Sequence, residues 1–404
     1  MELGFNGIAD VLQKQKSIGF HDVYNDRNNL HDADQTFVSN TTTFELFDDF
    51  TIKNIFGYND VFSLDQNDID GSPYQWLRIG VINPILDESA VDRLDRGYNY
   101  GTKQISNELQ LTGKVGRANI IVGAFLSEEK SLNRVPLTAV PDLGQPAIGR
   151  YLFTVKDKSK ALFAQVTYAA TDRLNLTGGF RYTWEDISIE EDPTSLFAFL
   201  NAGITERKDR KPSWLAGIDY HVTDSLMVYF NHRGSWRTGG FNGTETINLQ
   251  DITQFKPETT YDFEAGAKFS GTIGGMRASL NAAVFDQYIK NVQRTLYIGV
   301  SALSGNVNKA RVTGFELDGR INLTDWLEIG GAFSCNNARY TDPIATVNGA
   351  NFFFGPYADA PKRSGSAYFR VSKDMAAGGE ISLRGDMYSQ SGLVHNISVS
   401  HEHR

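Results

Sequence analysis

The sequence predicts an all-β protein: a large, antiparallel, up-and-down transmembrane β-barrel. Three observations predict it. Apolar and polar residues alternate along many segments, short turns alternate with long polar connections, and no run approaches the roughly 18 apolar residues of a membrane helix. The composition agrees, because Gly (38 residues), Tyr (17) and Phe (26) are frequent, as expected for strands and turns.

Period-two alternation marks the individual strands. From Leu174 to Trp184 every second residue is apolar or glycine, and most of the residues between them are polar. The pattern recurs over residues 213–222, 260–269 and 315–323. Because successive side chains of a strand point to opposite faces, each segment predicts a strand with one apolar and one polar face. About ten such residues, tilted by about 45°, span roughly 23 Å, close to the apolar band of membrane barrels.

Seven short polar turns join these strands in pairs. Three of them share a Thr-Asp-x-Leu signature and begin at Thr171, Thr223 and Thr324. The other four lie at residues 48–49, 113–117, 271–275 and 376–379. They recur about every 50 to 65 residues, which indicates one repeating architecture with about 14 to 18 strands.

The connections between these pairs are long and polar. They cover approximately residues 57–101, 128–159, 190–212, 234–257 and 338–361. In an up-and-down barrel alternate connections lie at the same end, so one end has short turns and the other has long loops, as in outer-membrane barrels. Tyr182 and Trp184 near a strand end suggest the aromatic girdle of a membrane interface.

The domain organisation follows from this repeat. Residues 35–404 form one β-barrel domain that we expect to be incomplete at both ends, and residues 1–34 are the remnant of an extracellular loop. The alternative is a soluble, propeller-like β-repeat binding module, whose blades also have about 50 residues. A propeller needs four short strands per repeat, whereas each repeat here shows two long ones. A soluble β-sandwich array is a third possibility, since its strands alternate too.

The charged and reactive residues suggest no enzyme. The net charge of −9 argues against a nucleic-acid-binding protein. The single cysteine, Cys335, has no partner for an intramolecular disulfide. His401 and His403 are close together but lack further ligands, so we expect no metal site. No catalytic constellation stands out, and we expect neither enzymatic activity nor a cofactor.

The polar face of the strands supplies the candidate site residues. In a barrel these side chains line the lumen, where most charges are expected to be paired. The candidates for contact with substrate are Arg181, Asp219, Glu264, Lys268 and Arg320.

Several segments together resemble the barrel of TonB-dependent receptors, most closely the iron–siderophore branch, over approximately residues 35–395. They are QISNELQLTG (104–113), IIVGAFLSEEK (120–130), ALFAQVTY (161–168), FKPETTYDFEAGAK (255–268) and VTGFELDG (312–319). The resemblance implies a barrel of about 22 strands around a plug domain, in the bacterial outer membrane. It implies uptake of a bulky nutrient, with a ferric siderophore as the leading expectation, driven by the TonB complex acting on the plug. Lipopolysaccharide is the expected lipid neighbour.

The chain also departs from the family pattern. We find no plug and no segment like a TonB box before residue 35, and residues 398–404 lack the aromatic terminal strand of such barrels. We therefore expect an internal fragment of a longer receptor.

Overall fold

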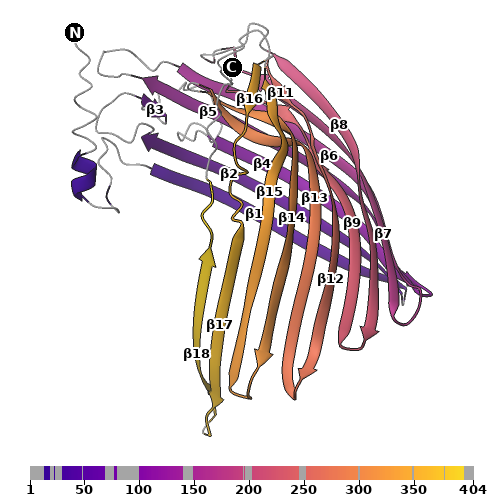
Figure 1. Ribbon diagram of the computed structural model, residues 1–404. Coiled ribbons are helices and arrows are strands. Elements are labelled where there is room, and N and C mark those ends of the chain that lie inside the picture. Colours follow the sequence, from indigo (N-terminus) through magenta and orange to yellow (C-terminus); the bar gives the residue numbers. More distant parts are fainter. Residues whose placement is uncertain are drawn as a thin grey trace.

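A computed structural model shows that most of the described strands form one curved antiparallel β-sheet (Figure 1). The structure describes residues 13–18, 22, 30–47, 49–68, 77–79, 100–139, 149–193, 195, 203–244, 252–298, 301–347, 350–376 and 378–394. Residues 13–18 are a short helix. Across these ranges, no helix is long and apolar enough to cross a membrane.

The main sheet has 16 strands, and β10 and β11 form a separate pair. The strands are β1 (Leu30–Phe47), β2 (Phe50–Asp68), β3 (Leu77–Ile79), β4 (Tyr100–Val115), β5 (Ala118–Ala139), β6 (Gly149–Ala169), β7 (Leu174–Glu191), β8 (Ile204–Thr223), β9 (Leu226–Arg237), β10 (Gly240–Phe241), β11 (Gln254–Phe255), β12 (Glu258–Ile273), β13 (Met276–Ile298), β14 (Ser301–Asn322), β15 (Leu327–Val347), β16 (Ala350–Phe353), β17 (Arg363–Asp374) and β18 (Glu380–Gln390).

The long strands pair in chain order, with β1 at one edge of the sheet and β18 at the other. In Figure 1 they form one curved wall, with the short turns at its lower end. A continuous sheet of long strands is the predicted up-and-down barrel wall and excludes the radial four-stranded blades of a propeller. The predicted range of strand number is confirmed.

The seven predicted short turns are confirmed, and the structure explains their residues. In the turn between β8 and β9, the Thr223 hydroxyl accepts hydrogen bonds from the backbone N–H groups of Ser225 (3.2 Å) and Leu226 (3.0 Å). The threonines of the other two Thr-Asp-x-Leu turns accept one such bond each. The turn between β12 and β13 instead uses Gly274 and Gly275, whose φ angles of 58° and 85° favour glycine.

The strands are longer than the alternation predicted. Residues 128–159 were expected to be a loop, but β5 runs to Ala139 and β6 begins at Gly149. In the same way β7 runs to Glu191 and β8 begins at Ile204, so both strands extend into residues 190–212. The reason is that the outer face becomes charged above the apolar band, so the apolar signal stops while the backbone ladder continues. The segment 395–404, with His401 and His403, lies outside the described residues.

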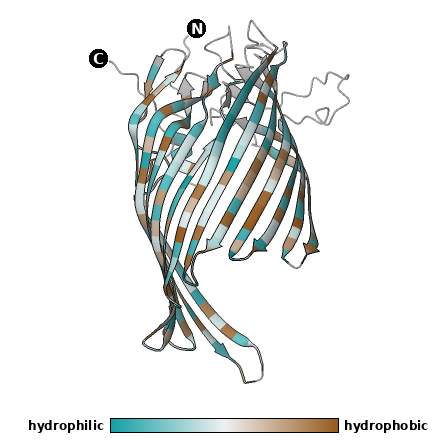
Figure 2. Ribbon diagram, turned by 90° about the vertical axis from the view of Figure 1, so that its right-hand side faces the viewer, coloured by the Kyte–Doolittle hydropathy of each residue, from teal (hydrophilic) through white to brown (hydrophobic). Residues whose placement is uncertain are grey.

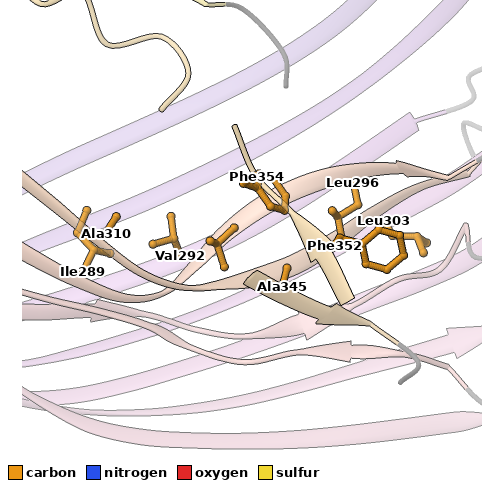
Figure 3. Close-up of a cluster of buried hydrophobic side chains, with 9 residues drawn as sticks. Ile289, Val292, Leu296, Leu303, Ala310, Ala345, Phe352 and Phe354 are labelled. Atoms are coloured by element: carbon orange, nitrogen blue, oxygen red, sulfur yellow. The ribbon is translucent and has the colours of Figure 1, made fainter. Parts of the chain in front are cut away.

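A buried apolar cluster of described residues lies at the long-loop end of β13–β16 (Figure 3). Its members are Ile289, Val292, Leu296, Leu303, Val307, Ala310, Ala345, Phe352 and Phe354. Asn291 has a φ of 54° and lies between Ile289 and Val292, which are both buried although three positions apart. The left-handed residue therefore shifts the alternation and keeps the upper part of β13 packed into the cluster.

Candidate functional site

The two faces of the wall differ in chemistry. On β7 the side chains of Leu176 and Phe180 are 40% and 55% exposed and lie on the convex side, whereas Arg181 and Thr183 point to the other side. Phe180 pairs across the sheet with Trp214 of β8, so the exposed apolar row continues from strand to strand. Figure 2 looks onto this outer face and shows the hydrophobic positions along the strands. Such a band suits contact with lipid.

The apolar band ends at a row of aromatic and cationic residues. Tyr182 and Trp184 contact each other edge to face, with ring centroids 4.8 Å apart. Trp184 lies opposite Lys160 on one side and Arg210 on the other. Beyond this row the outward positions of β5, β6 and β8 are mostly charged. They include Glu128, Lys130, Lys156, Lys158, Glu206 and Lys208. This change locates the upper edge of the lipid-facing band.

His232 keeps its polar atoms paired on the outer face. Its Nε2 accepts a hydrogen bond from the Trp214 indole N–H (3.1 Å), and its Nδ1 lies 2.8 Å from the backbone oxygen of Asp262. Both ring nitrogens thus have a hydrogen-bond partner. The ring also stacks on Phe263 at 4.5 Å. A histidine with both nitrogens bonded is compatible with an apolar surrounding.

The inner face carries a charge network that spans β9 and β12. The Arg233 guanidinium binds Asp262 at 2.9 Å and Glu264 at 2.8 Å. The two acids are largely shielded, while Arg233 is 43% exposed. Glu264 was a candidate for contact with substrate, and the structure shows it already paired. Arg233 was not among the predicted candidates, although the alternation of β9 places it on the polar face.

The other candidates also lie on the inner face, but they do not form one site. Arg181 lies over the rings of Phe125 (5.2 Å) and Phe163 (5.6 Å). Lys268 lies 5.5 Å from the ring of Tyr229, which is opposite Asp219 in the register. Arg320 lies on β14, opposite Ser279 and Gly330. The structure thus groups Asp219, Glu264 and Lys268 along β8–β12 and leaves Arg181 and Arg320 apart. Their contact with substrate stays a prediction.

A second network lies at the long-loop end. The carboxylate of Asp209, 9% exposed, accepts two hydrogen bonds from Arg207 at 2.6 and 2.9 Å. It also accepts one from the Thr238 hydroxyl (3.0 Å) and one from the Gly239 backbone N–H (3.2 Å). Burial alone raises the pKa of Asp209, but these donors outweigh burial and hold the pKa below its usual range. The group is therefore ionised and fixed in place.

A cavity of about 440 Å³ opens at the same end between β15 and the segments that follow β16 and β18. Tyr340 and Tyr357 line it, with ring centroids 5.0 Å apart, together with Arg339 and Lys362. Beside it, Arg294 donates a hydrogen bond to the Tyr340 hydroxyl (2.9 Å) and lies 4.6 Å from the Tyr357 ring. Burial raises the pKa of Tyr340, although Arg294 acts in the opposite direction. The cavity thus combines phenol rings with cations.

Within the described residues, no group of three or more His, Cys, Asp or Glu side chains could hold a metal ion. Cys335 is half-buried and lies on β15 opposite Phe315. The inner face and the cavity offer hydrogen bonds, charges and aromatic rings, which are the means of non-covalent binding.

Comparison with known proteins points to one family. A family model described as "TonB dependent receptor-like, beta-barrel" matches residues 3–395. An uncharacterised TonB-dependent receptor of Haemophilus influenzae is 30% identical over 179 residues, which are 44% of this chain and 48% of that protein. The catecholate siderophore receptor Fiu of Escherichia coli K12 is 27% identical over 199 residues, 46% of this chain and 24% of that one.

Solved structures share the fold. The ferric yersiniabactin uptake receptor FyuA of Yersinia pestis superposes with a TM-score of 0.65 at 15% identity, covering 88% of this chain and 49% of that one. The matched region thus spans less than half of each of these relatives.

Proposed function

Because this chain belongs to the TonB-dependent receptor β-barrel family of bacterial outer-membrane proteins, we propose that it forms the wall of a receptor that takes up a bulky nutrient, foremost a ferric siderophore. The observation that carries the proposal is the two-faced wall: exposed apolar residues such as Phe180 and Leu162 on one side, and the Arg233 network on the other. Such a wall separates lipid from a polar lumen.

The orientation follows from the connections. Outer-membrane barrels place short turns in the periplasm and long loops outside the cell. The cavity beside Tyr340 and the Asp209 network then lie at the extracellular mouth, where cargo arrives. The polar inner face below it, including Asp219 and Lys268, would face a plug domain or the passing cargo.

The chemistry of the mouth favours an anionic, aromatic chelate. Lys362 lines the cavity and offers positive charge, and Arg294 lies at its edge. Tyr340 and Tyr357 offer ring faces and hydroxyl groups. Cations bind carboxylate, catecholate or phosphate oxygens, and rings stack on flat ligands. Two of the similar proteins carry names that refer to ferric chelates: a catecholate siderophore receptor and a ferric yersiniabactin uptake receptor.

The partners are part of the proposal. Energy would come from the TonB complex pulling on a plug domain held in the lumen. Lipopolysaccharide phosphates would contact the outward cations next to Trp184, namely Lys160 and Arg210, which lie at the edge of the apolar band. The barrel would bind and pass its cargo without catalysing a reaction.

Uptake of iron-55 tests the proposal. The receptor is expressed in an iron-limited host that lacks its own ferric-siderophore receptors, and catecholate, hydroxamate and carboxylate chelates are compared. We expect accumulation of at least one chelate, abolished when the TonB gene is deleted. Arg294→Met serves as the site variant, and Arg370→Met serves as its matched control, because Arg370 lies near the short-turn end of β17, where it pairs with Glu380. A correctly inserted receptor that accumulates none of the chelates contradicts the proposal.

A further inference from the structure

The described residues 238–244 and 252–257 between β9 and β12, which we call the mouth hairpin, fill a gap in the upper wall. β9 ends at Arg237 and β12 begins at Glu258, whereas the neighbouring strands β8 and β13 continue further toward the long-loop end. Strands β10 and β11 pair within the hairpin, with Gly240 opposite Phe255.

One side of the mouth hairpin is bound to inward-facing residues of β6–β8. Asp209 of β8 accepts the hydrogen bonds from Thr238 and Gly239 described above. Phe241 and Ile252 pack against Ile189 of β7, which is fully buried. These contacts lie on the side of the wall opposite the lipid-facing row, so the hairpin leans toward the lumen.

The other side is bound to β14 through Asn242, which is 6% exposed. Its side-chain amide donates to the backbone oxygen of Ser304 (3.0 Å) and accepts from the backbone N–H of Ser304 (2.8 Å). The side-chain amide of Asn242 thus forms the same two N–H···O bonds that a backbone residue forms with the residue opposite it on a neighbouring antiparallel strand. Asn306 repeats the arrangement with Lys256: its amide accepts from the backbone N–H (2.6 Å) and donates to the backbone oxygen (2.9 Å).

β13 adds a third attachment through Gln293. Its side-chain amide donates to the backbone oxygens of Thr238 (2.7 Å) and Lys256 (3.1 Å), so one residue holds both ends of the hairpin. In the sheet order β8 and β14 are separated by β9, β12 and β13. The hairpin is therefore attached to β8 on one side and to β13 and β14 on the other. A rotation of the hairpin about either attachment would break the hydrogen bonds of the other.

We propose that the mouth hairpin is a fixed strut that stays in place during uptake and narrows the opening, so that it selects cargo by width. Loops that move are drawn from regions with few buried contacts, and this hairpin has buried contacts at both described ends. Asp209 and Asn242 are then positioning residues: they touch the hairpin or the wall and act on cargo only through its placement. The inference rests on the proposed uptake function.

A cross-link tests whether the strut moves. Lys256→Cys and Ser304→Cys leave the described attachments intact, because only backbone groups of these two residues take part in them. Cys335→Ser provides the background, since Cys335 is the sole native cysteine. A short bifunctional linker that forms a disulfide with each cysteine, and that reduction therefore removes, then joins the hairpin and β14. We expect efficient linkage in the purified receptor, seen by mass spectrometry, and chelate uptake within twofold of the unlinked protein.

Two outcomes overturn the inference: the cysteines fail to link, or linkage lowers uptake more than tenfold and reductive cleavage restores it. The mass-spectrometric readout does not need transport. A receptor that links but takes up no chelate even before linkage therefore refutes the proposed function and not the attachment.

Asn242→Ala tests the role in selection. We expect it to leave uptake of the preferred chelate within threefold but to raise uptake of a wider, poorly transported chelate at least fivefold. Asn308→Ala is the matched control, because Asn308 lies on β14 near the residue that Asn242 bonds, but it is exposed and bonds Asp342. An unchanged ratio in Asn242→Ala, in a receptor that folds normally, contradicts the selecting role.

Discussion

Replacing Leu317 of β14 by arginine gives a sharp test of which face meets lipid. Leu317 is 41% exposed and pairs with Ala282 and Phe333 on the outer face. It precedes the strand end, Asn322, by five residues. At about 3.3 Å per residue and a tilt of about 45°, this places it roughly 12 Å above the short turns, near the middle of a band about 25 Å tall.

At that depth an arginine on the lipid face costs about 2–4 kcal/mol, which lowers the folding equilibrium roughly 30-fold to several hundredfold. The neighbouring Glu316 points to the lumen and is exposed. Glu316→Arg is therefore expected to stay within about 0.5 kcal/mol, as for other wet surface positions. The assay is urea unfolding in phospholipid vesicles, followed by tryptophan fluorescence. Equal stability of the two variants would refute the assignment of faces, because in water both sites are simply surface.

Three further predictions concern charged groups. Arg233→Met removes the cation that pairs with Asp262 and Glu264. Because Arg233 is 43% exposed, we expect a loss of about 1 kcal/mol or less in the same unfolding assay, and a loss above about 3 kcal/mol would contradict a solvated lumen. Because the pKa of Asp209 is lowered, its ionised form stabilises the mouth hairpin at any pH above the usual aspartate pKa of about 3.9. This stabilisation is lost as the pH falls through the lowered pKa. Protease resistance of the hairpin is thus expected to be flat between about pH 5 and 8 and to fall below about pH 4, whereas Asp209→Asn shows no such fall. Arg294→Met is expected to raise the Kd of an anionic chelate roughly 2- to 30-fold, since a cation–π contact contributes about 0.5–2 kcal/mol. An unchanged Kd would show that the cavity is not part of the binding site.

The membrane-spanning part of the strands could be predicted from the sequence. The alternation from Leu174 to Trp184 is strong because the lipid face of a strand needs an apolar residue at every second position. The Thr-Asp-x-Leu turns could be found because the threonine hydroxyl bonds the turn locally, within three residues. Both signals depend only on neighbours in the chain.

The upper part of the wall could not be predicted in the same way. On β6, Lys156, Lys158 and Lys160 occupy the outward positions. Water solvates these side chains as well as the polar ones between them, so both faces of the strand are polar and the sequence there shows no alternation of apolar and polar residues. The pairing of Arg233 with Glu264 depends on the register between β9 and β12. The attachment of Asn242 to β14 joins residues 62 positions apart. No local rule specifies either contact.

The central claim is that the row from Leu174 to Trp184 faces lipid while the residues between face a wet lumen. A nitroxide scan over these positions, in a Cys335→Ser background in bilayers, measures it directly through collision with oxygen and with a water-soluble nickel complex. We expect oxygen accessibility to peak at the even positions, including Leu176 and Phe180, and nickel accessibility to peak at the odd ones, including Arg181. Peaks in the opposite phase, or no period-two variation, would contradict the account.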